Sequence, residues 1–251
     1  MKISIVTIAF NAEATIADAV ASVISQKRDG FDLEYIVVDG ASSDGTLDAI
    51  APYRDQINQL ISEPDQGLYD AMNKGLRAAT GDFVGILNAD DLYAGDDVLQ
   101  KVAAQLSASG ADSLYGDLVY VDRHATERVT RRWVSGTFHP RSFLRGWMPP
   151  HPTFFMRRDA VDQFGEFSLK LSSAADYELM LRMLCKHGLS TVYLPEVLVR
   201  MRVGGMSNAS WANRWRANRE DREAWRMNGL RPWPWTVWMK PLRKLPQLWS
   251  R

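Results

Sequence analysis

The stretch GDFVGILNADD, residues 81–91, joins a short apolar run to a cluster of one amide and two carboxylates. The apolar run, residues 83–87, predicts a buried strand, because parallel strands covered on both faces read as continuous apolar segments. Residues that follow such a strand lie at the carboxyl edge of the sheet, where open α/β sheets bind ligands. Oxygen atoms of amides and carboxylates suit Mg²⁺ or Mn²⁺, which leave positions open for phosphate oxygens. The stretch therefore indicates phosphate-ester chemistry.

Strand-like and helix-like patterns alternate through the first hundred residues. Apolar runs predict strands at residues 3–8, 33–38, 57–61 and 83–87. Amphipathic spacing predicts a helix at residues 13–26. Further helices are predicted from about Asp44, after a capping Ser43, and at residues 68–79, before Gly81. This alternation predicts an α/β fold with a mostly parallel, doubly wound central sheet.

The pattern changes after a predicted helix at residues 96–107. Residues 113–121 and 127–134 alternate in polarity, as paired strands do at the antiparallel edge of a mixed sheet. A loop rich in proline and aromatic residues then precedes a short predicted strand at residues 153–156. The remaining predictions are a helix at residues 174–187, one or two strands within residues 189–203, and a helical extension at residues 208–251.

The composition bounds the class of protein. With 251 residues and 46% hydrophobic content, the chain can bury the core of one large domain. Basic and acidic residues number 30 each, which gives no indication of a nucleic-acid partner. Cys185 is the only cysteine, so no intramolecular disulfide is expected and a reducing compartment is favoured. No apolar run approaches the roughly 18 residues of a membrane-spanning helix, and the opening run reads as a core strand because no small-residue cleavage site follows it.

The last 41 residues differ in composition from the rest. Residues 211–251 hold ten basic and three acidic residues, together with seven of the nine tryptophans. Indoles favour the headgroup zone of a bilayer, and basic side chains are attracted to anionic lipid. This composition favours a helix that lies on a membrane; the alternatives are indoles that pack back onto the domain or form a dimer contact.

Two nucleotide-binding motifs are absent from the chain. The first predicted strand ends in Ala9, Phe10 and Asn11, without the GxGxxG glycines of a dinucleotide site, and no GxxxxGK[ST] motif occurs. The second predicted strand ends instead in Asp39, where a carboxylate can accept hydrogen bonds from a base or a ribose. Capping of its own loop is the alternative role for this acid.

The motifs, taken together and in order, resemble glycosyltransferase family 2, an inverting family with the GT-A fold. The matching segments are SIVTIAFN, VVDGASSDGT, EPDQGLYDAMNKGLRAATGDF, LNADD, HPTFFMRR and AADYELMLRM. They span about four fifths of the chain. The resemblance implies a GT-A-like catalytic domain at residues 1–207, with a nucleotide-sugar half at residues 1–110 and an acceptor half at residues 111–207, before the helical tail at residues 208–251.

The resemblance also implies a set of donor-binding residues in the first half. Lys74 would meet a phosphate and Asn73 would brace its loop, although Lys74 can also be read as an exposed helix charge. The full set that the resemblance places at the donor is Thr7, Ala9, Phe10, Asn11, Asp39, Asp65, Asn73, Lys74, Asn88, Ala89 and Asp90.

The metal motif of the family is Asp-x-Asp, and this chain departs from it at Asn88. An amide oxygen is a weaker ligand than a carboxylate but can still coordinate a cation or contact the sugar. Asp90 is therefore the main expected ligand of Mn²⁺ or Mg²⁺, with Asn88 beside it. Asp91 is expected to support these residues or to cap a helix.

Asp176 occupies the position at which the resemblance implies the catalytic base. An inverting transfer needs a carboxylate that takes the proton of the acceptor hydroxyl; capping of the following helix is the structural alternative for Asp176, and Glu178 is the rival base. His151, Arg200 and Arg202 are further candidates for contact with acceptor or diphosphate, since guanidinium groups suit bidentate phosphate contacts. A structural histidine and rim arginines are the alternatives.

The sequence thus predicts an inverting, metal-dependent hexosyltransferase-like enzyme that uses a nucleotide-diphosphate sugar. Its expected acceptor is a lipid-linked glycan of polysaccharide assembly, and its expected place is cytoplasmic, peripheral at the inner face of the cell membrane. A degenerate nucleotide-binding scaffold at the membrane is the alternative that Asn88 leaves open. A sugar nucleotidyltransferase is disfavoured, because the first loop lacks the Gly-rich, Arg-bearing sequence that it would need.

Overall fold

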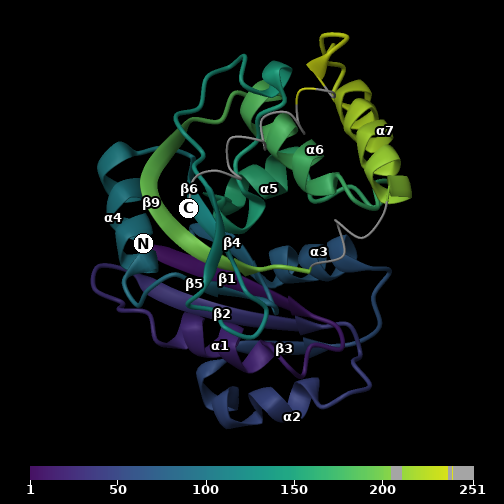
Figure 1. Cartoon of the computed structure of the whole chain (residues 1–251). Coiled ribbons are helices and arrows are strands. Elements are labelled where there is room, and N and C mark those ends of the chain that lie inside the picture. The colour runs from purple at the N-terminus through teal and green to yellow at the C-terminus, as the bar shows by residue number, and fades with distance from the viewer. Residues whose placement is uncertain (205–210, 237–238, 240–251) are drawn as a thin grey trace.

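The computed structural model describes residues 1–204, 211–236 and 239, with the side chains of residues 211–216 left out. Among these residues, nine strands form one mixed sheet in the order β3-β2-β1-β4-β8-β6-β9-β5, and β7 pairs with β6 at the side. Helices α3, α5, α6 and α7 lie on one side of the sheet, and α1 and α2 lie on the other (Figure 1). The predicted mostly parallel, doubly wound α/β fold is confirmed.

The first half of the chain forms the parallel part of the sheet. Its strands are β1 (Lys2–Ala9), β2 (Asp32–Asp39), β3 (Gln59–Ser62) and β4 (Phe83–Asn88). The connecting elements are α1 (Ile16–Ile24), α2 (Thr46–Ile50), the 3-10 turn η1 (Ala51–Gln56) and α3 (Leu68–Ala78). Strand β1 pairs in parallel with both β2 and β4, which makes it the centre of this half.

The second half continues the sheet with antiparallel and parallel pairs. It contains β5 (Asp91–Tyr93), α4 (Val98–Ser109), β6 (Ser113–Val121), β7 (Val129–Trp133), β8 (Phe155–Arg157), α5 (Arg158–Phe164), α6 (Ala175–Leu181), β9 (Thr191–Arg202) and α7 (Trp211–Met227). Short helical turns occur at η2 (Phe143–Arg145), η3 (His151–Thr153) and η4 (Arg182–Lys186). The expected antiparallel pairing of the two strands after α4 is confirmed in β6 and β7.

Each strand contributes to two cores because its side chains alternate between the two faces of the sheet. On β1, Val6 and Ile8 enter the core beneath α3 and α6, whereas Ile3 and Ile5 enter the core beneath α1 and α4. Helix α3 lies very close to β1, because a Cβ on Gly75 would come within 2.1 Å of Val6 Cγ1. This close approach explains a glycine inside a helix, where it otherwise costs stability.

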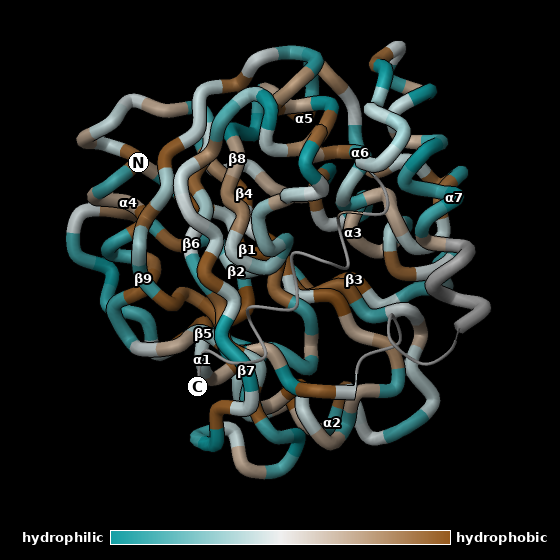
Figure 2. Tube along the Cα trace, turned by 45° about the horizontal axis from the view of Figure 1, so that its top comes forward, coloured by the Kyte–Doolittle hydropathy of each residue, from teal (hydrophilic) through white to brown (hydrophobic). Residues whose placement is uncertain are grey.

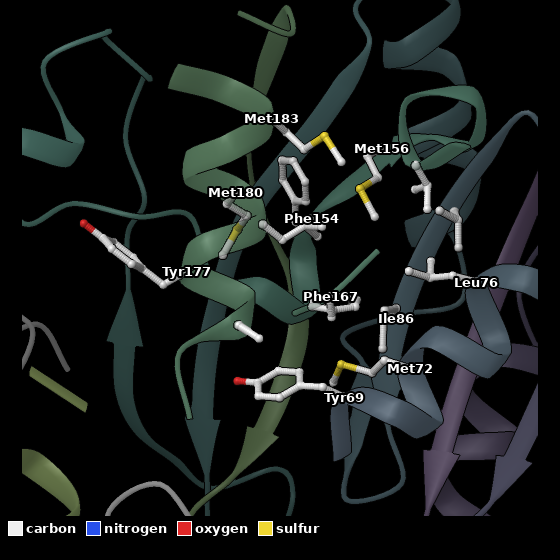
Figure 3. Packing of buried hydrophobic residues seen from close by; sticks show 14 of the residues in the cluster. Tyr69, Met72, Leu76, Ile86, Phe154, Met156, Phe167, Tyr177, Met180 and Met183 are labelled. Carbon is white, nitrogen blue, oxygen red and sulfur yellow. The ribbon is translucent and has the colours of Figure 1, made fainter. Parts of the chain in front are cut away.

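The core beneath α3 and α6 is rich in methionine and aromatic side chains. Figure 3 shows Met72 of α3 beside Tyr69 and Phe167, and Met180 and Met183 near Phe154. Unbranched methionine side chains fill irregular gaps between helices and a twisted sheet. This core joins the first half to the second half of the chain.

Helix α7 packs on α6 and does not stand apart from the domain. Trp225 is 4% exposed, and its Nε1 donates a hydrogen bond of 2.9 Å to the hydroxyl of Tyr177. Asn228 Nδ2 donates to Glu178 Oε1 at 3.0 Å. The alternative of an indole packed onto the domain is therefore realised at Trp225. Trp238, Trp249 and the side chains of Trp211 and Trp215 lie outside the described part.

Several element boundaries differ from the sequence prediction for local reasons. The predicted helix at residues 174–187 becomes α6 followed by the wider turn η4. Asp91 begins the short strand β5, which the sequence did not predict, and does not cap a helix. Ser43 does not cap α2 either, since Gly45 precedes that helix without a capping side chain. Helix α5 was also missed, because at seven residues it is too short for a clear periodicity.

We expect Glu34→Gln to destabilise the fold at neutral pH. Burial raises the pKa of Glu34, but hydrogen bonds from Lys2, Ser4 and Thr80 outweigh it and lower that pKa to about 2. A carboxyl with a depressed pKa stabilises the fold above its unfolded pKa, and this contribution is lost as the pH falls through the folded value. Because Lys2 is 40% exposed, the loss should be about 1–2 kcal/mol, below the full linkage value.

Urea unfolding at pH 7 and at pH 3 measures this contribution. The stability gap between wild type and Glu34→Gln should narrow as the pH falls from the ordinary value of 4.5 towards 2. Asp55→Asn, the matching change at an exposed acid, is the control. Its free energy of unfolding should differ little from that of wild type at either pH. A gap for Glu34→Gln that stayed constant with pH would contradict the assignment.

Candidate active site

The carboxyl ends of β1, β2, β3 and β4 meet at one edge of the sheet. In the strand register Ala9 lies opposite Asp39, Asp39 lies opposite Ser62, and Ile8 lies opposite Asn88. Backbone hydrogen bonds continue this alignment into the loops, from Gly40 N to Ala9 O at 2.9 Å and from Ala89 N to Ile8 O at 3.1 Å. Parallel pairing thus brings segments that are far apart in the sequence to one ligand-binding edge.

Asp39 is fully buried at this edge and is held by its own loop. Its carboxylate accepts hydrogen bonds from Ser42 N at 3.1 Å, from Ser42 Oγ at 2.5 Å and from Ser62 Oγ at 2.7 Å. These donors neutralise much of the cost of burying a charge. Loop capping by Asp39 is therefore realised, and its position at the strand end also keeps it a candidate for nucleoside contact.

The loops after β1 and β2 hold two residues in the left-handed region. Asn11 has φ 48° and Ala41 has φ 59°. Asn11 Oδ1 accepts a hydrogen bond from Ser43 N at 3.0 Å, and Asn11 N donates to Ser42 Oγ at 2.8 Å. A left-handed alanine costs free energy, and such residues persist where the surroundings fix them. The two loops thus form one interlocked unit above the sheet edge.

Asp65, in the segment between β3 and α3, and Lys74, in α3, extend this unit. Gly40 allows the approach of Asp65, because a Cβ there would meet Asp65 Oδ2 at 2.3 Å. Lys74 is 13% exposed, and its Nζ lies 2.9 Å from Glu63 Oε1 and 2.7 Å from Pro64 O. The ammonium group therefore has protein partners and is not a freely exposed helix charge.

The Asn88–Asp91 segment presents oxygen atoms that have no partner within the described residues. Asn88 Nδ2 donates to Asp91 Oδ2 at 3.1 Å, whereas Asn88 Oδ1 and Asp91 Oδ1 are buried and accept no hydrogen bond. Burial, together with the nearby charge of Asp90, raises the pKa of Asp91 well above its ordinary value. Buried oxygen atoms without a hydrogen-bond partner normally contact a cation, a donor group or water. This segment is therefore suited to a hard divalent metal.

The protein's own side chains do not complete a metal site. Among residues 1–204, 211–236 and 239, no group of three His, Cys, Asp or Glu side chains is placed to hold a metal ion. The half-buried carboxylate of Asp90 accepts no hydrogen bond and forms no ion pair in this part of the chain. A metal here would need further oxygens, which a diphosphate can supply.

Arg202 holds the Asp90 loop in place from the end of β9. Its side chain is 4% exposed; Nη1 donates to Asp90 O at 2.9 Å, Nε donates to Arg123 O at 3.1 Å, and Nη2 pairs with Asp18. Arg200 pairs with Glu127. Both guanidinium groups are engaged within the protein, so the described geometry favours bracing over diphosphate contact for Arg202. Residues 205–210, which follow shortly after Arg202, lie outside the described residues.

Asp176 projects from the first turn of α6 beside Tyr69 of α3. The Tyr69 hydroxyl donates a hydrogen bond of 3.2 Å to Asp176 Oδ1. Burial and the charge of Asp176 both raise the pKa of Tyr69, so the phenol stays protonated and remains a donor. Ala174 precedes the helix, and Asp176 is its second residue. Asp176 therefore does not cap α6 and is available for chemistry.

Phe167 links the residues around Asp176. Asn73 holds its backbone through two hydrogen bonds of 2.9 Å, from Asn73 Nδ2 to Phe167 O and from Phe167 N to Asn73 Oδ1. The ring lies 5.7 Å from that of Tyr69 and 5.6 Å from that of His151. Burial lowers the pKa of His151, while Asp176 raises it in part. The imidazole of His151 and the phenol of Tyr69 thus both lie against the Phe167 ring, and the phenol contacts the Asp176 carboxylate.

Glu178 lies on the opposite side of α6 from these residues. Its carboxylate is 4% exposed, pairs with Arg182 Nη2 at 2.9 Å and accepts a hydrogen bond from Asn228. Arg182 also donates to the backbone oxygens of Phe164, Gly165 and Glu166. Glu178 therefore anchors α7 and the segment after α5, and the described geometry favours Asp176 as the base.

The remaining donor-site candidates differ in how far their side chains are exposed at the carboxyl edge of the sheet. Thr7 is fully buried, and its hydroxyl accepts a hydrogen bond from Tyr35, so its side chain supports the core. Ala9 and Ala89 are each 5% exposed, whereas Phe10 is 64% exposed at the start of its loop. An exposed aromatic ring beside Asp39 is free to stack on a planar ligand.

Tyr69 and Phe167 were not identified from the sequence. Tyr69 lies in the segment DQGLYDAMNKG, residues 65–75, where the pattern of an amphipathic helix indicates a core position. Its hydroxyl was the available signal, because a buried tyrosine normally needs a hydrogen-bond partner. Phe167 lies in a loop whose spatial neighbours no local pattern reveals.

Comparison with known proteins agrees with this geometry. A family model described as glycosyl transferase family 2 matches residues 4–165. An uncharacterized glycosyltransferase of Mycobacterium tuberculosis is 35% identical over 188 residues, which cover 72% of this chain and 68% of that protein.

Two solved structures share the fold. S. aureus TarS 1-349 in complex with UDP-GlcNAc has a TM-score of 0.65 at 21% identity, covering 91% of this chain and 65% of that one. The mannosyltransferase PcManGT of Pyrobaculum calidifontis, in complex with GDP-Man and Mn²⁺, has a TM-score of 0.66 at 21% identity, covering 98% and 71%. This chain therefore spans slightly less than two thirds of the TarS fragment. From the family match and the mycobacterial relative, the chain belongs to glycosyl transferase family 2.

Proposed function

We propose that this protein is an inverting glycosyltransferase that moves a sugar from a nucleotide-diphosphate sugar to a hydroxyl group of an acceptor. The observation that carries the proposal is the position of helix α3 between two sets of acids. Its N-terminal turn places Tyr69 against Asp176. The segment before the helix brings Asp65 to the edge that holds Asp39, and Lys74 of the helix pairs with Glu63 of that segment. One helix therefore links a nucleotide-binding edge to a carboxylate suited to act as a base.

In the proposed reaction Asp176 takes the proton of the acceptor hydroxyl. The hydroxyl oxygen forms a bond to the anomeric carbon while the bond from that carbon to the diphosphate oxygen breaks. The electron pair leaves with the nucleoside diphosphate, on the face opposite to attack, which inverts the configuration. Tyr69 holds Asp176 in position, and His151 and Phe167 form the wall beside it.

Asp90 and Asn88 are the proposed ligands of Mn²⁺ or Mg²⁺. When bound, such an ion offsets negative charge on the departing diphosphate. Asp91 orients Asn88 by accepting its amide hydrogen, which leaves Asn88 Oδ1 directed away from that bond. The Mn²⁺ bound with GDP-Man in PcManGT supports the choice of metal.

The proposed acceptor is a lipid-linked glycan of polysaccharide assembly, reached from the cytoplasmic side by peripheral contact through the tail at residues 208–251. The basic and tryptophan-rich composition of the tail supports this contact. No helix within the described ranges is both long and apolar enough to cross a bilayer.

A panel of nucleotide sugars tests the proposed function. Purified protein with Mn²⁺ is expected to hydrolyse one UDP or GDP sugar slowly, and to transfer the sugar when a glycan acceptor is added. Binding of UDP or GDP without any hydrolysis or transfer across the panel would instead support the degenerate scaffold.

Asp176→Asn is expected to reduce transfer by about 10²–10⁴-fold, because the amide cannot accept the proton. Donor binding, measured by calorimetry with Mn²⁺ and the nucleotide, should stay unchanged. Glu178→Gln is not a neutral control, since it breaks the pair with Arg182. Full transfer activity in Asp176→Asn would remove Asp176 as the base.

Tyr69→Phe is expected to lower kcat about five- to tenfold with little change in KM for the donor. The substitution removes one hydrogen bond to a charged group and keeps the ring packed on Phe167. Steady-state kinetics separates the two constants. Tyr53→Phe in η1 is the matched control, and an equal loss in that variant would show that the effect is not specific to the site.

Asp90→Ala is expected to weaken nucleotide binding in Mn²⁺ by at least about 10²-fold and to abolish transfer, because it removes the main carboxylate ligand. Binding measured with EDTA in place of the metal should differ little from wild type. Asp96→Ala, at an exposed acid in the following loop, should bind as wild type does. Equal Mn²⁺ dependence in Asp90→Ala and wild type would contradict this ligand assignment.

A further inference from the structure

A cavity of about 520 Å³ lies where α7 ends and the chain turns back. Its lining combines the guanidinium groups of Arg222, Arg226 and Arg231 with the apolar side chains of Leu230 and Trp233 and two prolines. Helix α7 stands at the margin of the molecule (Figure 1), and its trace is largely hydrophilic in Figure 2. The residues that line the cavity belong to the end of α7 and to the segment that follows it, residues 222–234.

The positive charge of this cavity is largely uncompensated. Arg226 pairs with Glu223 at 2.5 Å, but Arg222 and Arg231 have no ion-pair partner in the described part of the chain. The other acids of α7 turn towards the domain. Glu220 accepts hydrogen bonds from Ser172 Oγ and Ser173 N at 2.6 and 2.8 Å, and Asp221 is 2% exposed. Glu220 and Asp221 thus face the domain, whereas Arg219, Arg222 and Arg226 are exposed.

The cavity is held in a fixed shape by contacts on both sides. Trp225 and Asn228 fasten α7 to α6, as described above. Gly229 turns the chain with φ 67°, and Leu230 N donates to Trp225 O at 3.0 Å. Thr236, which is 1% exposed, donates to Leu144 O at 2.7 Å. Preorganised donors lose less entropy on binding than flexible ones.

An exposed aromatic side chain lies beside the cavity. Trp235 is 53% exposed, and its ring centroid is 5.8 Å from that of Trp233. Indole rings favour the boundary between lipid headgroups and acyl chains. Guanidinium groups are suited to bidentate contact with phosphate oxygens. The arginines of the cavity can therefore bind a phosphate, and the neighbouring Trp235 can contact the layer between lipid headgroups and acyl chains.

We propose that the Arg222–Arg231–Trp233 cavity binds the phosphate of an anionic phospholipid headgroup, with Trp235 inserted into the adjacent headgroup layer. The inference rests on the peripheral membrane contact proposed above, and it assigns that contact to a defined pocket. A soluble phosphate would satisfy the arginines but would leave Trp235 and the prolines exposed to water. The apolar lining and the exposed indole therefore favour a lipid over a soluble anion.

Vesicle flotation tests this assignment with the full-length chain. Wild type is expected to float with phosphatidylcholine vesicles that contain phosphatidylglycerol and to remain unbound with pure phosphatidylcholine. Arg222→Glu and Arg231→Glu should each weaken binding at least about fivefold, since one basic residue near an anionic surface contributes about that factor. Arg219→Glu makes the same charge change at an exposed site on α7 outside the cavity lining. It should weaken binding less than Arg222→Glu does, because it loses the general attraction of one basic residue but keeps the contact made in the cavity. Thermal melts verify that all variants fold.

Three outcomes would overturn the proposal. The first is the absence of flotation of wild type on anionic vesicles. The second is an equal loss in Arg219→Glu and Arg222→Glu, which would mean that general charge and not the cavity attracts the membrane. The third is saturable binding of inorganic phosphate, abolished by Arg222→Glu, in a protein that does not float, which would identify a soluble anion as the ligand. Donor hydrolysis by wild type without vesicles tests the transferase function separately.

Discussion

The pairing of β1 with strands on both sides is the constraint on which the site depends. Because β2 and β4 both run parallel to β1, their carboxyl ends stop at the same level as Ala9. Asp39 and Asn88 are 49 residues apart in the chain, yet this register places both of them at the same edge of the sheet. A slip of one residue in either pair would turn the terminal side chain to the opposite face of the sheet.

Helix α3 converts this edge into a two-sided site. Gly75 lets the helix lie against β1, and this close packing fixes the direction in which its first turn points. Tyr69 then meets α6, while Asn73 holds the backbone of Phe167. The uncharged Tyr69 hydroxyl donates a hydrogen bond to the half-buried Asp176, and no cation pairs with Asp176 within the described residues. The proposed base would therefore be held in position and could still accept a proton.

Much of the fold could be predicted from the sequence, since β1, β2 and β4 are continuous apolar runs and α1 carries a periodic apolar stripe. The strand ends also identified Asp39 and Asp90 as candidates, because topology alone places them at one edge. Local patterns could not show that Arg202 reaches back to the Asp90 loop, or that Glu178 is bound by Arg182 and Asn228. Those contacts depend on how α6, α7 and β9 pack, which no short window of sequence contains.

The sequence of the tail, residues 208–251, likewise could not show which tryptophans are buried and which are exposed. Composition suggested that indoles as a class face the membrane, but Trp225 packs in the core while Trp235 stays exposed. The difference follows from position, since Trp225 lies on the inner side of α7 and Trp235 follows the turn at Gly229. One tryptophan-rich segment can therefore serve both as a fastening and as a contact surface.

The two hydrogen bonds between Asn73 and Phe167 have a consequence for how such enzymes diversify. They tie α3, which the proposed function places at the nucleotide, to the Phe167 loop, which it places near the acceptor, through backbone atoms of Phe167. Any residue except proline at position 167 can keep those bonds, so the ring can be exchanged without breaking the link between α3 and the loop. A chimera that takes its acceptor half from a relative should therefore tolerate variation at position 167 far better than loss of Asn73.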